Sequence, residues 1–297
     1  MSALLQGQVI AAFGRQYLIQ LHDGSNVPCL TRGKKSEAAC GDLVEISHSG
    51  ISSSHSTQTP GVIEHVTPRS SLLYRSDAYR EKLIAANVTQ VVVVVAAEPI
   101  FSDELLSRCL VAAYNQKLEA LIVLNKCDLK EAASVARQRL APYLAIGYRV
   151  VELSALEDVS LLRPLLNGHT SVLVGQSGMG KSTLINALVP AAQATTREIS
   201  TALDSGKHTT THARLYRLDS NSALIDCPGV QAFGLHHLSL GEIEQGFIEF
   251  APYLGKCRFH NCQHLHEPDC ALRKAAANGT IDPRRLELFQ QISQAKY

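Results

Sequence analysis

The amino-acid sequence predicts a chain of three parts, and three observations lead to this prediction. Short candidate strands fill residues 1–65, and from about residue 91 strands of the buried type alternate with helices. After about residue 236 the strand pattern stops, and two helical patterns flank a cluster of cysteines and histidines. A strand-only part, an alternating part and a helical part are three different architectures, with expected boundaries at 1–68, 69–235 and 236–297.

The composition is that of a globular protein with apolar cores. Of the 297 residues, 45% are hydrophobic and 19% are charged, and the formal net charge of +1 gives no sign of nucleic-acid binding. The longest apolar run, residues 91–97, is too short to cross a bilayer, and the N-terminus has no signal-peptide pattern. We therefore expect a cytoplasmic protein with no membrane partner.

The first part reads as strands divided by turn residues. The segments QGQVIAAF and QYLIQLH flank Gly14-Arg15, a plausible hairpin turn, and NVPCLTR, DLVEISH and GVIEHV follow. Five short strands in about sixty residues predict a small closed β-barrel of the OB type. The polar segment 49–61 is expected to be a loop between the last two strands, and residues 69–90 a connector.

In the second part, VVVVVAA is typical of a strand buried on both faces. Ser102 is expected to cap the next helix. The apolar stripe of that helix consists of Leu105, Leu106, Cys109, Leu110 and Ala113. The strands ALIVLN, YRVVEL and TSVLVG and a helix over 131–145 continue the alternation. This pattern predicts an α/β domain with a doubly wound, mostly parallel sheet.

A glycine-rich loop follows the strand TSVLVG and precedes a helical segment. Gly175-x-x-x-x-Gly180-Lys181-Ser182 matches the phosphate-loop pattern, in which backbone N–H groups turn inward around phosphate oxygens. Lys181 can reach the β- and γ-phosphates, and the Ser182 hydroxyl can take a Mg²⁺ position. The expected phosphate-binding residues are Gly175, Gln176, Ser177, Gly178, Met179, Gly180, Lys181, Ser182 and Thr183.

The segment NKCD at 125–128 follows a buried strand, at the edge of the sheet where ligands bind. Asp128 can accept hydrogen bonds from guanine N1–H and the 2-amino group. Adenine lacks this donor pair and would leave the buried carboxylate unpaired, which disfavours an ATPase. Asn125 is expected to tie the loops together, and Lys126 to lie along the base.

Two further segments follow strands. In SAL, Ser154 and Ala155 come directly after YRVVEL, and the Ala155 N–H can reach guanine O6. In DCPG, Asp226 supplies the acidic residue expected near Mg²⁺, and Gly229 is free to meet the γ-phosphate. These segments complete the parts that a guanine nucleotide site needs.

The segment GKHTTTH at 206–212 lies between the phosphate loop and DCPG. Thr210 is the expected Mg²⁺ ligand, with Thr209 and Thr211 as alternatives. Many GTPases orient the attacking water with a glutamine after the glycine of the DxxG segment, but this chain has Val230 there. His208 is the nearest side chain able to orient the water or accept its proton. The expected catalytic set is His208, Lys181 and Thr210.

Cysteines and an imidazole gather near the C-terminus, at Cys257, Cys262, His264 and Cys270. A Cys₃His set without an open position is a structural zinc site. His260 and His266 are alternative imidazole ligands, and spacing does not choose among the three. The scattered cysteines are expected to be ordinary buried thiols: Cys29, Cys40, Cys109, Cys127 and Cys227.

The order of the segments is unusual, because the base-reading loop and SAL precede the phosphate loop, GKHTTTH and DCPG. Over essentially the whole chain, this order and the zinc spacing resemble the circularly permuted small-ribosomal-subunit biogenesis GTPases, the RsgA (YjeQ) family. The resemblance implies an N-terminal OB-type barrel, a central circularly permuted P-loop GTPase domain and a C-terminal helical zinc-binding module. It also selects His264 as the zinc ligand and places a catalytic histidine at His208.

The resemblance further implies that the protein binds the 30S ribosomal subunit and its 16S rRNA and assists late maturation. It would hydrolyse GTP to GDP and phosphate with ribosomal stimulation, and then dissociate; we expect a monomer. The barrel is slightly acidic, with four basic and five acidic residues in 1–65. Strong phosphate binders are basic, so binding through shape and ribosomal proteins is expected.

Two other functions stay open at this point. One is a nucleotide-gated RNA or protein scaffold, and the other is a permuted GTPase that acts on a different RNA. The permuted order itself has a mechanical consequence in all three cases. It lets the segment after DCPG run directly into the zinc module, so that release of one loop on hydrolysis could move a whole domain.

Overall fold

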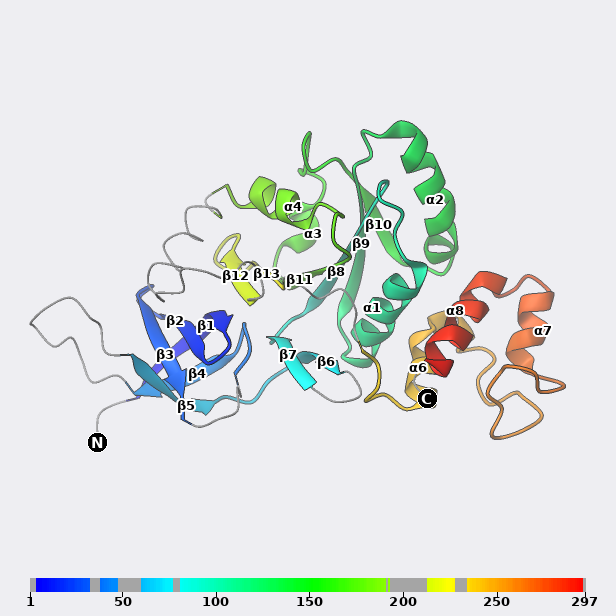
Figure 1. Ribbon diagram of the computed structural model, residues 1–297, viewed down its shortest axis with the longest axis horizontal. Coiled ribbons are helices and arrows are strands. Elements are labelled where there is room, and N and C mark those ends of the chain that lie inside the picture. Colours follow the sequence, from blue (N-terminus) through cyan, green and yellow to red (C-terminus); the bar gives the residue numbers. More distant parts are fainter. Residues whose placement is uncertain are drawn as a thin grey trace, which may run out of the picture.

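The computed structural model describes residues 4–32, 38–47, 60–76, 81–190, 192, 213–227 and 234–295. The three predicted architectures follow one another along the long axis of the molecule (Figure 1). The barrel lies at one end, the central sheet with its helices in the middle, and the helical module at the other end. Among the described residues, no helix combines the length and apolarity needed to cross a membrane.

The predicted barrel strands are confirmed. Their bounds are β1 (Leu5–Phe13), β2 (Gln16–Leu21), β3 (Asn26–Thr31), β4 (Leu43–Ser47) and β5 (Gly61–Val66). They pair in the order β1-β2-β3-β5-β4, and β4 pairs again with β1, which closes the barrel. Gly14, at the predicted hairpin turn, has a φ of 65°. The barrel core is formed mainly by Val9, Tyr17, Ile19, Val44 and Ile46.

The connector contains a hairpin that the sequence did not predict, with strands β6 (Leu72–Ser76) and β7 (Glu81–Ala86). An ion pair holds the chain where it leaves the barrel. The fully buried Asp42 accepts hydrogen bonds from Arg69 Nε at 2.7 Å and Arg69 Nη2 at 2.8 Å. A bidentate pair of this kind fixes the connector against the barrel.

The central sheet has the predicted doubly wound form. Its strands are β8 (Gln90–Ala96), β9 (Glu119–Asn125), β10 (Arg149–Glu152), β11 (Thr170–Val174), β12 (Ala213–Arg217) and β13 (Ala223–Asp226). They lie in the order β10-β9-β8-β11-β13-β12, parallel except for β12. The helices between them are α1 (Asp103–Asn115), α2 (Lys130–Ala145), α3 (Arg163–Leu166) and α4 (Lys181–Leu188). Ser102 caps α1 as predicted, by accepting a hydrogen bond from the Leu105 N–H.

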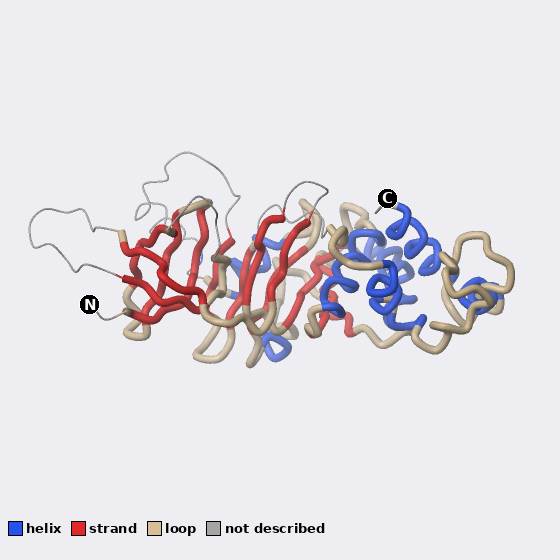
Figure 2. The backbone as a smooth tube through the Cα atoms, turned by 90° about the horizontal axis from the view of Figure 1, so that it is seen from below, coloured by secondary structure: helices blue, strands red, loops and turns tan. Residues whose placement is uncertain are grey.

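The barrel and the central sheet are joined by backbone pairing. Strand β1 pairs antiparallel with β12, with Ala11 opposite Arg214 and Ala12 opposite Ala213. The strands therefore form one continuous sheet from β10 to the barrel. Figure 2 shows the strands following one another along the molecule.

The C-terminal module contains α6 (Leu240–Gly246), a 3₁₀ turn η1 (Ile248–Phe250), α7 (Ala271–Ala277) and α8 (Pro283–Gln294). The first helical pattern, over 239–254, is only partly helical, because α6 ends before Phe247, whose φ and ψ are −89° and 83°. The break places Phe247 and Phe250, both fully buried, against Phe289 of α8, with ring centroids 5.5 Å and 5.4 Å away. Packing of these rings overrides the helical propensity of the segment.

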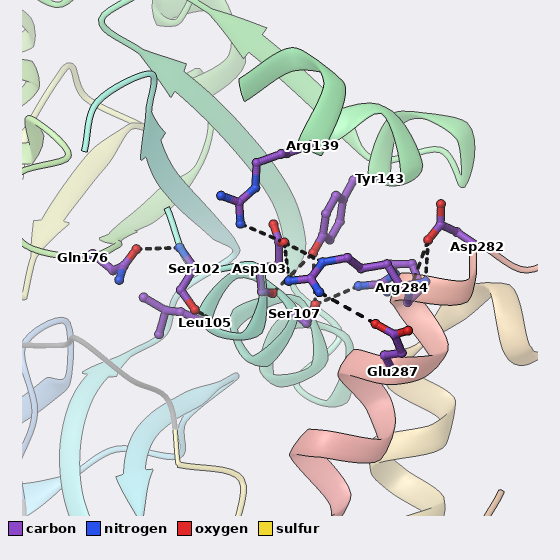
Figure 3. Close-up of polar contacts among 11 residues, drawn as sticks. Ser102, Asp103, Leu105, Ser107, Arg139, Tyr143, Gln176, Asp282, Arg284 and Glu287 are labelled. Carbon is purple, nitrogen blue, oxygen red and sulfur yellow. Dashed lines mark hydrogen bonds and ion pairs between the residues drawn. The ribbon is translucent and has the colours of Figure 1, made fainter. Parts of the chain in front are cut away.

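Side chains fasten the module to α1. The buried Arg285 donates to Glu249 at 2.7 Å and to Ser107 of α1 at 2.8 Å. Asp103, at the start of α1, accepts from Arg139 of α2 at 2.9 Å and from Arg284 of α8 at 3.0 Å (Figure 3). Asp103 thus lies where the helices of the sheet domain meet the module.

The scattered cysteines are free thiols. Cys29, Cys40, Cys109 and Cys227 are buried, and Cys127 is half-buried.

Candidate nucleotide and zinc sites

The glycine-rich loop connects β11 to α4, the context that a phosphate loop requires. Gly175 has a φ of 146° and Gly180 a φ of 87°. A Cβ atom at Gly175 would lie 2.2 Å from the Val94 carbonyl oxygen, and one at Gly180 would lie 2.3 Å from Asn125 Nδ2. Glycine is therefore required at both positions, because the loop is pressed against β8 and against the NKCD segment.

Lys181 lies over this loop. Its Nζ donates to the carbonyl oxygens of Gly175 at 2.6 Å and Gln176 at 2.7 Å. Burial lowers the pKa of Lys181, against an opposing contribution from the nearby Asp226 carboxylate. Phosphate oxygens could replace the two carbonyl oxygens as partners of the ammonium group, so Lys181 is already positioned for a polyphosphate.

Asn125 links three segments that are far apart in the sequence. It is 2% exposed. Its Nδ2 donates to the Met179 carbonyl oxygen at 2.9 Å, and its Oδ1 accepts from the Ala155 N–H at 2.9 Å. One side chain thereby holds the NKCD, SAL and phosphate loops together, although the phosphate loop follows the other two in the sequence.

The other base-site residues surround this link. Lys126 is half-buried with a φ of 64°, and Ser154 Oγ is buried without a hydrogen-bond partner among the described residues. Asp128 is exposed, whereas the sequence interpretation took it as buried. Its carboxylate lies on a surface turn, so a bound base would itself have to supply the burial that discriminates against adenine.

Asp226 ends β13 beside the phosphate loop. Burial raises its pKa, while the charges of Lys181 and Arg214 act in the opposite direction. Together with the exposed Ser182 hydroxyl at the start of α4, Asp226 provides oxygen donors, which suit Mg²⁺. His208, Thr209, Thr210, Thr211, Gly229 and Val230 lie outside the described residues.

Sequence reasoning missed Arg214. It lies directly opposite Asp226 in the β12–β13 pair, is 7% exposed, and has an Nη2 atom with no partner among the described residues. Residues directly opposite in an antiparallel pair share a face. A basic residue shortly before DCPG is only a weak sequence signal for a site residue, since nothing in the sequence indicates that its guanidinium is buried.

The cysteine cluster forms a compact cage. His264 Nδ1 lies 3.3 Å from Cys270 Sγ, 3.5 Å from Cys257 Sγ and 3.6 Å from Cys262 Sγ. Cys257 Sγ and Cys270 Sγ are 3.9 Å apart. Zinc bonds of about 2.3 Å to sulfur and about 2.0 Å to nitrogen give tetrahedral edges of about 3.5–3.8 Å, so these residues fit zinc.

Further contacts orient the cage. Glu244 of α6 lies 3.0 Å from His264 Nε2, which leaves Nδ1 directed at the three sulfur atoms. Gln290 of α8 donates to the His264 carbonyl oxygen at 2.6 Å. The alternative ligands His260 and His266 are exposed and lie outside the cluster. The structure therefore gathers Cys257, Cys262, His264 and Cys270, the set that the family resemblance selected.

Comparisons with known proteins agree with this geometry. The model of the family described as RsgA GTPase matches residues 66–236. A relative from Nitrosospira multiformis, named small ribosomal subunit biogenesis GTPase RsgA, is 54% identical over 97% of this chain and 90% of its own length. The chain belongs to the RsgA GTPase family. It is accordingly a GTPase, that is, a hydrolase that acts on GTP.

Two solved structures have the same fold. YjeQ from Thermotoga maritima superposes with a TM-score of 0.73 at 27% identity, over 99% of both chains. YloQ, described as a circularly permuted GTPase, gives a TM-score of 0.68 at 24% identity, over 99% of this chain and 96% of its own. The reversed order of segments in this RsgA-family chain is therefore a circular permutation.

Proposed function

We propose that this RsgA-family GTPase binds the small ribosomal subunit, assists its late maturation, and dissociates after hydrolysing GTP. The main support is the relative named small ribosomal subunit biogenesis GTPase RsgA, which is 54% identical over 97% of the chain. The protein would contact the 16S rRNA of the small subunit directly and would act as a cytoplasmic monomer.

Guanine specificity would come from Asp128, which accepts from the base, and from the Ala155 N–H, which would have to exchange its hydrogen bond to Asn125 Oδ1 for one to guanine O6. Asn125 holds both segments against the phosphate loop through its two 2.9 Å hydrogen bonds. Lys126 lies along the base, and Ser154 gains a partner for its buried hydroxyl. The residues from Gly175 to Thr183 surround the phosphates.

The reaction needs charge neutralisation and an oriented water. Ser182 and Thr210 would hold Mg²⁺ with Asp226 nearby, and the ion would neutralise charge on the phosphate oxygens. Lys181 contacts the β- and γ-phosphates and stabilises the charge that develops on them. Gly229 meets the γ-phosphate through its backbone, and His208 orients the attacking water, because Val230 cannot.

Zinc bound by Cys257, Cys262, His264 and Cys270 has a structural role, since the cage presents four protein ligands and no open position. The zinc module is modestly basic, through Lys256, Arg258, Arg273, Lys274, Arg284 and Arg285.

Ribosomal stimulation can reach the nucleotide from both ends of the molecule. Residues 193–212 lead directly into β12, which pairs with β1 of the barrel. Residues 228–233 lead toward α6 of the zinc module. A subunit that holds the barrel and the module would thereby restrain both segments, which carry His208, Thr210 and Gly229.

The test is GTP turnover by the purified protein alone, with 30S subunits and with 50S subunits. We expect strong stimulation by 30S subunits only, and its loss in His208→Ala. A scaffold whose hydrolysis is incidental would keep its maturation function in His208→Ala. Equal or absent stimulation by the two subunits would contradict the ribosomal assignment while leaving the guanine site intact.

A further inference from the structure

A pocket lies where the sheet domain meets the helical module. It has a volume of about 360 Å³ and is lined by the second half of α2, the start of α8 and Asp103 of α1. Arg139 and Arg284 add charged groups to its wall, and Pro142 and Leu288 add apolar surface. None of the described residues that line it belongs to the nucleotide or zinc site. A volume of this size is in the range of small-molecule sites.

The carboxylate of Asp103 is unevenly engaged. Its Oδ2 accepts from Arg139 Nη2 at 2.9 Å and from Arg284 Nε at 3.0 Å (Figure 3). Its Oδ1 is buried and has no hydrogen-bond partner among the described residues. A buried carboxylate oxygen without a donor is unfavourable. The Oδ1 atom is therefore suited to an N–H or ammonium group that a ligand brings.

The two arginines at Asp103 have capacity for a further anion. Among the described residues, the carboxylate of Asp103 is the only ion-pair partner of Arg139, and Arg284 shares it. A second acid, Glu287, approaches Arg284 only to 3.8 Å, and both of these side chains are more than half exposed, so that water screens the pair. Asp282 is engaged as the cap of α8, where it accepts from the backbone N–H of Arg284 at 2.8 Å. Two guanidinium groups that share one carboxylate can bind another.

The wall beside these groups is already ordered. The buried Arg285 donates through Nε to Glu249 at 2.7 Å and through Nη1 to Ser107 at 2.8 Å, and its guanidinium carbon lies 4.8 Å from the centre of the Tyr143 ring. Arg285 is thus fully engaged within the protein, unlike Arg139. A pocket with fixed walls loses little conformational entropy when a ligand binds.

We propose that this pocket binds a free α-amino acid. In the bound state the ammonium group donates to Asp103 Oδ1, the carboxylate accepts from Arg139 and Arg284, and the side chain packs against Pro142 and Leu288. The pocket places an unpaired acceptor beside underused donors, and an amino acid carries the complementary groups two bonds apart. A purely anionic ligand would meet the Asp103 carboxylate, and a purely cationic ligand would meet the arginines. This inference goes beyond the proposed function and does not depend on it.

Calorimetric titration of the full native chain with each of the common L-amino acids tests the proposal. We expect saturable binding of at least one amino acid with an apolar side chain. Its N-acetyl derivative lacks the ammonium group and its amide lacks the carboxylate, so each should bind weaker by about tenfold or more. Hydrogen exchange should show added protection at the starts of α1 and α8 when the amino acid is bound.

Two variants locate the binding at this pocket. Arg139→Gln removes one carboxylate partner and keeps the pair between Asp103 and Arg284, whereas Asp103→Asn keeps the shape of the side chain and removes its charge. Each should weaken amino-acid binding by about tenfold or more. The matched control is Arg137→Gln in the same helix, because Arg137 pairs with Glu152 at 2.8 Å and does not line the pocket. Zinc content and GTP turnover without amino acid should be native in all three.

Three outcomes would overturn the proposal. The first is that no amino acid binds saturably up to millimolar concentrations, which would show that the pocket holds only solvent. The second is that the N-acetyl derivative and the amide bind as tightly as the parent amino acid. The third is that Arg139→Gln binds the amino acid as the native protein and Arg137→Gln do, since the site would then lie elsewhere.

Discussion

The barrel and the zinc module flank the same sheet domain, but they are attached to it in different ways. The barrel is joined by backbone pairing between β1 and β12, so it is an extension of the sheet. The module is joined by side-chain packing on α1, which includes the buried Arg285 of α8 and the contact of Gly246 with Val111. A strand-paired joint transmits movement of β12 directly, whereas a side-chain joint can be released by changing a few contacts.

Both joints lead to the nucleotide loops. Strand β12 carries Arg214 opposite Asp226. On the other side, the Ser102 N–H at the start of α1 donates to Gln176 Oε1 of the phosphate loop at 2.8 Å, next to Asp103, which holds Arg284 (Figure 3). The nucleotide loops are therefore connected to the two ends of the molecule by two mechanical routes, one through backbone and one through side chains.

Removal of zinc is expected to have the largest effect. It should destabilise the zinc module and leave the stability of the barrel unchanged. Zinc contributes on the order of 10 kcal/mol to small zinc domains, so Cys262→Ser should unfold the zinc loop and α7. Hydrogen exchange should show lost protection over 256–277 and unchanged protection in the barrel. Retained protection in a zinc-free protein would show that side-chain packing is sufficient for the module.

Arg285→Ala should break the side-chain joint. It leaves the Glu249 carboxylate, which is 7% exposed, without its cation, and this should cost about 3–5 kcal/mol of module stability. The neighbouring Arg284, which is 55% exposed, is the matched control, and Arg284→Ala should cost about 1 kcal/mol or less. Urea unfolding monitored by hydrogen exchange in α8 measures both, and equal costs would contradict the assignment of the joint to Arg285.

Gly246→Ala tests how closely the module packs on the sheet domain. A Cβ atom at Gly246 would lie 2.8 Å and 2.9 Å from the methyl groups of Val111 and 3.0 Å from its Cα, so α6 would be pushed off α1 at a cost of about 1–3 kcal/mol. Gly241, in the same helix, has open space at the corresponding point. Gly241→Ala should therefore be neutral or stabilising by up to about 1 kcal/mol in a thermal melt.

Local patterns predicted the strands of the barrel and of the parallel sheet, because alternation and buried runs are properties of short segments. They did not predict the β1–β12 joint, which rests on pairing between Ala11 and Arg214, about two hundred residues apart. The end of α6 at Gly246 was also beyond local reasoning, since it depends on Phe289 far along the chain. Within the candidate site, motif spacing identified the residues that belong to known motifs. It did not identify Arg214, whose burial arises from tertiary packing.

The smallest expected effect is on the pH dependence of stability, and it concerns Asp226, which lies opposite Arg214 of the strand that pairs with the barrel. Burial raises the folded pKa of Asp226 above its ordinary value of 3.8, so the folded protein holds this proton to higher pH than the unfolded chain. The resulting stabilisation is complete below about 3.8 and is lost as pH rises through the folded pKa. The urea midpoint should be measured without Mg²⁺ for the native protein and for Asp226→Asn, which has no titrating group at this position. As pH rises from about 3.8 through the folded pKa of Asp226, the midpoint of the native protein should fall relative to that of Asp226→Asn. Other acidic groups cancel in this difference. The opposite slope would mean that Lys181 and Arg214 overcome the cost of burial, and the β12 joint would then be stabilised by the ionised carboxylate.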